Sequence, residues 1–361
     1  MSAPVSEFRP GLEGVIAFET EIAEPDKDGG SLRYRGVDIE ELVGRYPFEN
    51  VWGLLVDEDI HSPLPPAEKI ELQDPSGSVP ADLQAALATL GPKWGLEQLV
   101  DISDSQARDD LARLSAATLS LVAQAARGSQ APVPDTAVDQ GENAAAQFLI
   151  RWRGEADPRA VRALDTYWIS GAEHGLNAST FTARIAASTG ADCAAALSSA
   201  VGTLSGRLHG GAPAHVLPML DAVAETGDAD AYVAGLLAHG DRIMGFGHRV
   251  YRAEDPRARV LRRTAEELGS PRVEVALALE RAALAGLRAK YPDRVLETNV
   301  EYWAAVVLDI ADVPPPLAPA MFACARVAGW SAHILEQKRT GRLVRPSARY
   351  VGPGPRSVDS L

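Results

Sequence analysis

Alanine supplies 60 of the 361 residues, and β-branched residues rarely alternate with polar ones. Alanine is the best helix former, and alternation of apolar with polar residues is the mark of a half-buried strand. The chain is therefore predicted to be all-α, with a short N-terminal β hairpin around residues 14–34 as the only extended part. Apolar spacing and terminal Ser, Asp, Pro and Gly residues predict helices over 105–127, 157–169, 192–204, 271–290 and 317–338.

The charge balance limits the kind of partner. There are 35 Lys and Arg against 49 Asp and Glu, a formal net charge of −14. General nucleic-acid and anionic-membrane binders present net positive faces, so neither class is expected. Cys193 and Cys324 lie far apart in apolar surroundings and predict buried free thiols, as in a reducing compartment. No signal peptide or membrane-spanning run is recognised, so we expect a cytoplasmic protein.

Three of the seven histidines lie in strings of small residues between predicted helices. They are EHGLNAST (residues 173–180), LHGGAP (208–213) and GFGHRVYR (245–252). Helix ends leave backbone groups unpaired, and glycine lets a ligand approach the backbone. A histidine at such a break is suited to donate a hydrogen bond to a substrate oxygen. His61, His215, His239 and His333 are interpreted as ordinary structural or surface residues. No histidine spacing matches a zinc motif, so no metal is predicted.

Arginines gather after the third histidine string. Arg262 and Arg263 fit a solvated helix face, whereas Arg252 and Arg257 are better placed for an anion. Arg326 lies in an otherwise apolar segment, and a buried arginine needs an anionic partner from the protein or from a substrate.

These strings, in this order, resemble the citrate synthase family over almost the whole chain. The specific matches are GFGHRVYRAEDPRAR (245–259), the N-terminal strings GLEGV (11–15) and LRYRGVDI (32–39), and RPSARYVGP (345–353). The resemblance implies an α-helical homodimer with a citrate-synthase-like two-domain fold. Residues 1–212 and 322–361 would form the large domain, and 213–321 the small domain that closes over the substrates. The implied reaction condenses oxaloacetate with acetyl-CoA and hydrolyses the thioester, with no metal or redox cofactor.

The resemblance also assigns roles to individual residues. It implies that His209 hydrogen-bonds the thioester carbonyl as it enolises and that His248 polarises the oxaloacetate ketone. His174 corresponds to a substrate-carboxylate contact. Arg252, Arg326 and Arg345 correspond to carboxylate-binding arginines, with Arg345 reaching in from the partner subunit. For the phosphates of CoA, the candidates are Arg257 and Arg259.

The position of the catalytic base departs from the family pattern. The family commonly has Asn-Val-Asp, but here the string is Asn299-Val300-Glu301. Glu301 keeps the carboxylate and adds about 1.5 Å of reach. A displacement of about 1 Å can cost on the order of 10²-fold in rate. The sequence leaves open a compensating backbone shift, slow turnover, or an altered function.

Three alternative functions follow. The first is a 2-methylcitrate synthase that uses propionyl-CoA, because one methylene in a pocket changes binding by only about 1–3 kcal/mol. The second is a weakly active homologue that binds CoA or carboxylates as a regulator, for which the Glu301 departure is the only support. The third, a helical nucleic-acid binder using Arg249–Arg263, conflicts with the net charge.

Overall fold

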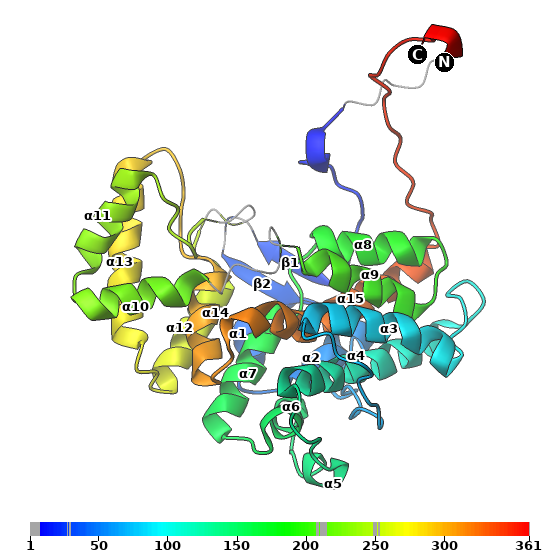
Figure 1. Ribbon diagram of the computed structural model, residues 1–361, viewed down its shortest axis with the longest axis horizontal. Helices are drawn as coiled ribbons and strands as arrows, with labels where there is room; N and C mark the ends of the chain where they lie inside the picture. Colours follow the sequence, from blue (N-terminus) through cyan, green and yellow to red (C-terminus); the bar gives the residue numbers. More distant parts are fainter. Residues whose placement is uncertain are drawn as a thin grey trace.

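The computed structural model describes residues 8–26, 28, 30–206, 209, 215–247, 251 and 253–360. The chain is 59% helical and carries one small sheet, which confirms the all-α prediction (Figure 1). The helices are α1 (Ile39–Leu42), α2 (Phe48–Asp57), α3 (Val79–Trp94), α4 (Asp104–Arg127), α5 (Asp135–Val138), α6 (Ala144–Arg153), α7 (Pro158–Gly171), α8 (Ala178–Ser188), α9 (Cys193–Leu204), α10 (Val216–Thr226), α11 (Ala229–His239), α12 (Pro256–Glu267), α13 (Val273–Lys290), α14 (Val300–Ile310) and α15 (Ala318–Thr340).

The predicted N-terminal hairpin is present. Strands β1 (Ala23–Asp26), β2 (Ser31–Tyr34) and β3 (Val37–Asp38) form an antiparallel sheet in that order. Tyr34 is buried, and its hydroxyl donates to the carbonyl of Ile169 at 2.9 Å and accepts from the backbone N–H of Glu173 at 3.2 Å. The sheet therefore fixes the chain where it leaves α7, next to the first histidine string.

Polar residues just before the helices explain where many of them begin. Ser103 accepts from the backbone of Gln106 before α4, and Asp192 accepts from Ala195 before α9. Such caps satisfy backbone N–H groups that a first helical turn leaves unpaired. The short helix α5 starts directly after Pro134, since proline fixes a backbone angle suited to a helix start.

Helix α15 runs through the centre of the larger body and positions much of the site. It packs against α2, α4, α7, α8 and α9. Most of its side chains are small and nearly all from Ala318 to Leu335 are buried, which lets five helices approach one axis. Cys193 and Cys324 are both buried and free, as predicted.

Helices α10, α11 and α13 gather at one end of the molecule, while α12 and α14 lie between that end and α7 (Figure 1). Trp303 of α14 donates to Glu280 of α13 at 2.9 Å, and Tyr302 donates to the Ala276 carbonyl at 2.7 Å.

Among the described residues, no single helix has the length and apolar composition of a membrane span. Only α14 together with Pro315–Thr340, bent by 119°, passes that test as a pair.

One buried carboxylate holds two helices together. Asp165 of α7 accepts a hydrogen bond from the backbone N–H of Phe48, at the start of α2, at 2.8 Å. Burial, with a smaller effect of nearby Glu49, raises the pKa of Asp165 from its ordinary 3.8 to about 7. Asp165 is therefore partly protonated near neutral pH.

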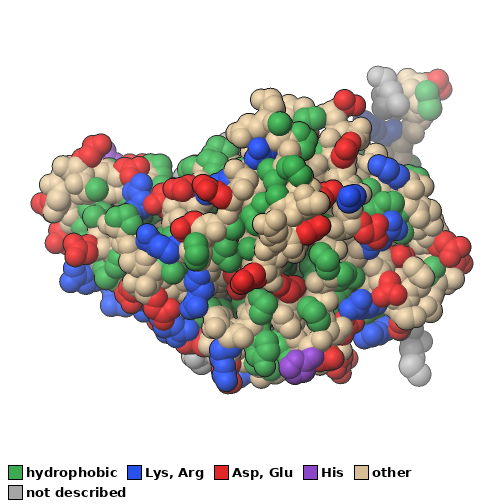
Figure 2. Space-filling view, turned by 90° about the horizontal axis from the view of Figure 1, so that it is seen from below, with side chains coloured by type: hydrophobic (Ala, Val, Ile, Leu, Met, Phe, Trp, Pro, Cys, Tyr) green, Lys and Arg blue, Asp and Glu red, His purple; other side chains and the backbone are tan. Residues whose placement is uncertain are grey.

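The surface mixes both signs of charge. On the face in Figure 2, acidic and basic side chains are interspersed rather than separated. Many of the described arginines are engaged by carboxylates; Arg262, for example, lies 3.0 Å from Glu254. A mixed surface of this kind gives no support to a nucleic-acid interface.

Candidate active site

Two distant strings are joined by backbone pairing. Gly247 N–H donates to the Glu297 carbonyl at 2.7 Å, and Asn299 N–H donates to the Gly245 carbonyl at 2.9 Å. Gly245 has φ +89°, and a Cβ there would lie 2.8 Å from the Tyr302 side chain, so only glycine fits. This pairing brings the GFG segment beside the start of α14, where Glu301 lies.

Glu301 occupies the first turn of α14. The Asn299 side chain accepts from the Glu301 backbone N–H at 3.0 Å and so fixes the start of the helix. Burial raises the pKa of the Glu301 carboxyl, Asp255 adds to that rise, and Arg257 opposes it. Within the described part of the chain, the Glu301 carboxylate makes no ion pair, which leaves it available as a base.

Asp255 joins two helix starts next to Glu301. Its carboxylate accepts from the Arg257 backbone at 3.0 Å, at the start of α12, and from the Val300 backbone at 3.2 Å, at the start of α14. It also pairs with the Arg257 guanidinium, at 3.0 Å to Nε and 2.7 Å to Nη2. Asp255 and Arg257 are both buried. Arg257, predicted to contact CoA phosphates, thus lies in a buried ion pair beside Glu301.

His209 lies after α9 and is supported from two helices. Its Nε2 is 2.8 Å from the Ser179 hydroxyl of α8, which also accepts from Trp330 Nε1 of α15 at 3.2 Å. Its ring stacks edge-on to Phe322 at 6.2 Å. Burial lowers the pKa of His209 from 6.5 to about 4, and Arg326 contributes to the decrease. His209 is therefore neutral near pH 7, and no hydrogen bond to the described residues occupies its Nδ1.

His174 follows α7 and contacts the third string. Its Nε2 lies 3.0 Å from the Tyr251 hydroxyl, and the two rings meet edge-on at 5.2 Å. This contact joins the EHGLNAST string to the GFGHRVYR string.

Arg326 is 2% exposed in the middle of α15. Its Nε donates to the Gly171 carbonyl at 2.9 Å, and its guanidinium lies 4.7 Å from the centre of the Phe322 ring. No described carboxylate forms an ion pair with it. Burial lowers the pKa of Arg326, and Glu173 opposes that effect. A buried guanidinium without a direct carboxylate partner fits the predicted need for an anionic ligand.

The remaining predicted residues lie apart or outside the description. Arg259 is partly exposed and pairs with Glu40 at 2.7 Å. Arg345 is exposed on the extended segment that follows α15 and leaves the body in Figure 1. His248 and Arg252 lie outside the described residues.

Sequence reasoning missed several residues that support the predicted ones. Ser179 and Tyr251 belong to the quoted strings, so their place in those strings was a usable signal. Asp255 directly precedes a proline, which is typical of a helix N-cap. Trp330 gave no signal, because its contact with Ser179 spans 151 residues.

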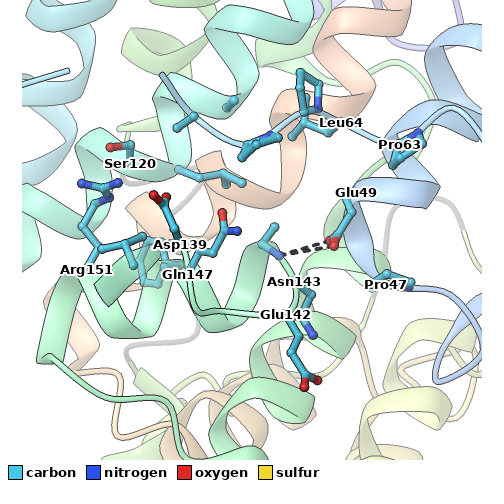
Figure 3. A pocket seen from close by; sticks show the side chains of 18 of the residues that line it. Pro47, Glu49, Pro63, Leu64, Ser120, Asp139, Glu142, Asn143, Gln147 and Arg151 are labelled. Carbon is cyan, nitrogen blue, oxygen red and sulfur yellow. Dashed lines mark hydrogen bonds between the residues drawn. The ribbon is translucent and has the colours of Figure 1, made fainter. Parts of the chain in front are cut away.

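A separate cavity of about 390 Å³ lies between α2, α4 and α6 (Figure 3). Glu49, Asp139, Glu142 and Gln147 line it, together with prolines and apolar side chains. None of the predicted site residues within the described part of the chain lines this cavity. It is therefore distinct from the site formed by His209, Arg326 and Glu301.

The fold and site together define a class: a helical enzyme with a neutral histidine, a carboxylate base and a buried arginine for an anionic substrate. The chain matches the family model described as "Citrate synthase, C-terminal domain" over residues 11–347. It belongs to the citrate synthase family, whose members are acyltransferases.

Individual relatives agree with this. A protein of Mycobacterium tuberculosis named "Putative citrate synthase 2" is 63% identical over 363 residues, covering 100% of this chain and 97% of that protein. A 2-methylcitrate synthase of Shewanella oneidensis is 33% identical, covering 96% of each chain. The citrate synthase of Thermoplasma acidophilum, solved with carboxymethyl coenzyme A and oxaloacetate, superposes with a TM-score of 0.84 at 27% identity and 98% coverage of both chains.

Proposed function

We propose that the protein is a citrate synthase that condenses oxaloacetate with acetyl-CoA and hydrolyses the thioester to citrate and CoA. The observation that carries this proposal is that the neutral His209 and the buried Arg326 both contact the Phe322 ring. His209 suits a developing enolate and Arg326 suits a substrate carboxylate. The enolate and the dicarboxylate must lie side by side for the condensation.

The first step removes a proton from the methyl group of the acyl thioester. Glu301 acts as the base, and burial raises its pKa and so makes it a stronger base than a solvated carboxylate. The neutral His209 donates a hydrogen bond to the thioester oxygen as negative charge develops there. For this bond we propose that the Ser179 hydroxyl turns its one hydrogen from Asn177 Oδ1, 2.9 Å away, to His209 Nε2, which places the ring proton on Nδ1. The enol then attacks the ketone carbon of oxaloacetate, which His248 is proposed to polarise.

The dicarboxylate needs fixed cations. Arg326 supplies one guanidinium, and we assign Arg257 to the same group because it is buried beside Glu301 and influences the pKa of both Glu301 and Arg326. His174 is proposed to add a hydrogen bond, with its orientation held by Tyr251. Arg252 keeps its predicted role at a carboxylate.

CoA is a co-substrate, and no metal or redox cofactor takes part in the proposed reaction. Arg259 remains the candidate for a CoA phosphate, a contact that competes with its pairing to Glu40. Arg257 would have to leave its buried pair with Asp255 to fill that role, which supports its assignment to the carboxylate.

Assembly and closure complete the proposal. We propose a cytoplasmic homodimer in which residues 1–212 and 322–361 form the large domain and 213–321 the closing small domain. The extended C-terminal segment supports the dimer, because Tyr350 and Val351 are 77% and 85% exposed and suit a partner surface.

The acyl specificity is tested with purified protein at fixed oxaloacetate, by comparing CoA release from acetyl-CoA and propionyl-CoA. We expect kcat/KM to favour acetyl-CoA by about 10-fold or more, the range that one methylene provides. A preference for propionyl-CoA would identify a 2-methylcitrate synthase. Binding of oxaloacetate or CoA without CoA release from either thioester would identify a regulatory homologue.

The swapped arginine is tested by mixing two inactive variants. In a dimer of Arg345→Ala with Glu301→Gln, one site keeps its own Glu301 and receives Arg345 from its neighbour. After refolding an equal mixture, half of the dimers are mixed and half of their sites are intact, so we expect about a quarter of wild-type activity. If Arg345 acts within its own chain, the mixture stays as inactive as its components.

A further inference from the structure

A group of buried polar side chains adjoins the site and includes Glu173 and His333. Glu173 directly precedes His174 and is 0% exposed. Its Oε1 lies 3.2 Å from His333 Nε2, off the line of a well-aligned hydrogen bond, and neither carboxylate oxygen accepts one from the described residues. Desolvation of a charge is costly, so a fully buried carboxylate without such hydrogen bonds needs other stabilising neighbours.

Helix α15 is shaped to receive this carboxylate. A Cβ at Gly329 would lie 2.0 Å from Glu173 Oε2 and 2.5 Å from the Ala172 carbonyl, so a larger residue would displace both. Arg326, Gly329 and His333 recur at intervals of three and four residues and share one face of α15. Glu173 thus meets α15 between the arginine and the histidine.

The protonation state of His333 follows from its other neighbour. Its Nδ1 lies 3.0 Å from Nη1 of Arg184. A guanidinium only donates hydrogen bonds, so Nδ1 is an acceptor and the ring proton lies on Nε2, facing Glu173. His333 is therefore a neutral imidazole with its N–H toward the carboxylate.

Arg184 is itself fixed on several sides. Its Nε donates to the Gln337 side chain at 3.0 Å, its Nη1 pairs with Glu336, and its guanidinium lies 4.1 Å from the centre of the Phe18 ring. The orientation of His333 is thus set by groups that have no place in the proposed reaction.

Glu173 also affects Arg326. Burial would raise the pKa of Glu173, but the His333 N–H and the charge of Arg326 oppose that rise and favour the ionised carboxylate. Glu173 in turn opposes the loss of charge on Arg326 without forming an ion pair with it. The Glu173 carboxylate helps to keep the Arg326 guanidinium charged and leaves it available to a substrate carboxylate.

We propose that His333 is a positioning residue that holds the Glu173 carboxylate against Gly329, which keeps Arg326 free to bind the substrate carboxylate. This deepens the proposed function and rests on it. Without the His333 N–H, the carboxylate turns toward Arg326, forms the ion pair that the structure lacks, and competes with the substrate.

The test compares His333→Phe, which keeps the ring but loses both nitrogens, with His333→Gln, whose amide can accept from Arg184 and donate to Glu173. We expect His333→Phe to raise the KM and the Kd for oxaloacetate about 10-fold or more, the range for a lost bond to a charged group, with kcat and the KM for acetyl-CoA within about 3-fold. His333→Gln should stay within about 3-fold of wild type. His239→Phe, on the exposed end of α11, is the control.

A double variant separates positioning from general damage. If the released carboxylate competes for Arg326, Glu173→Gln should recover part of the lost oxaloacetate affinity in the His333→Phe background. A folded His333→Phe protein with wild-type oxaloacetate KM, or with kcat and affinity reduced in the same proportion, would overturn the proposal.

Two further measurements keep the outcomes distinct. Nitrogen-15 NMR of labelled wild-type protein should show the Nε2-protonated neutral tautomer for His333, and an imidazolium or the other tautomer would contradict the inference even if the variants fail to fold. Wild-type protein that neither binds oxaloacetate nor releases CoA would overturn the proposed function instead.

Discussion

Replacing Glu301 with Gln is expected to lower kcat by about 10³-fold, the usual contribution of a general base. The amide keeps the size and leaves the α14 start intact, because the Asn299 cap holds the backbone of residue 301 rather than its side chain. It removes only the ability to accept a proton. Exchange of the acetyl-CoA methyl protons with deuterated water should stop, as followed by NMR.

Two comparisons make this result specific. Glu266→Gln, on the exposed side of α12, changes the same functional group away from the site and should leave kcat unchanged. Glu301→Asp withdraws the carboxylate by about 1.5 Å and should retain activity at about a tenth to a hundredth of wild type. Full proton exchange in Glu301→Gln would place the base on another residue. An Asp variant faster than wild type would show that the longer side chain is poorly placed.

Replacing His209 with Ala is the second large effect, with an expected loss of about 10²–10³-fold in kcat. The loss arises because the imidazole donates to the developing enolate and is not replaced by water in a closed site. With the pKa of His209 lowered to about 4, kcat should not change with the protonation of this residue between pH 6 and 8. Steady-state CoA release between pH 6 and 8 measures both the loss in kcat and its dependence on pH.

The matched control for this variant is His239→Ala, which removes a histidine from the surface of α11. Thermal unfolding of both variants should remain close to wild type, since the contacts of the His209 ring with the described residues are those to Phe322 and Ser179. Near-normal turnover in a folded His209→Ala protein would contradict the role assigned to this residue.

Local patterns predicted a large part of the fold. Helices α4, α7, α9, α13 and α15 start or end within two residues of the predicted limits, because their caps and prolines act over a few residues. The hairpin and the free buried cysteines were also predicted. The bounds of the two domains stay a prediction.

The environment of the site residues was harder to predict. Arg257 was expected to contact phosphates, yet Asp255, only two residues away, binds it inside the protein. Asp255 also accepts from Val300, and this contact across 45 residues brings the pair to the start of α14. Similarly, His333 was interpreted as an ordinary core histidine, and only its packing against both Arg184 and Glu173 suggests more. Such arrangements come from tertiary packing, which spacing along the chain does not report.

The buried Asp165 has a consequence for how folding is linked to protons. Its pKa is about 7 in the folded chain and near 3.8 when exposed, so the folded protein binds the extra proton between these values. Stability from this group is therefore greatest below pH 3.8 and falls as the pH rises through about 7, by up to about 4 kcal/mol. Unfolding near pH 5 releases this proton to solvent. The start of α2 is thus a place where a rise in pH from acid to neutral, rather than acidification, weakens the fold.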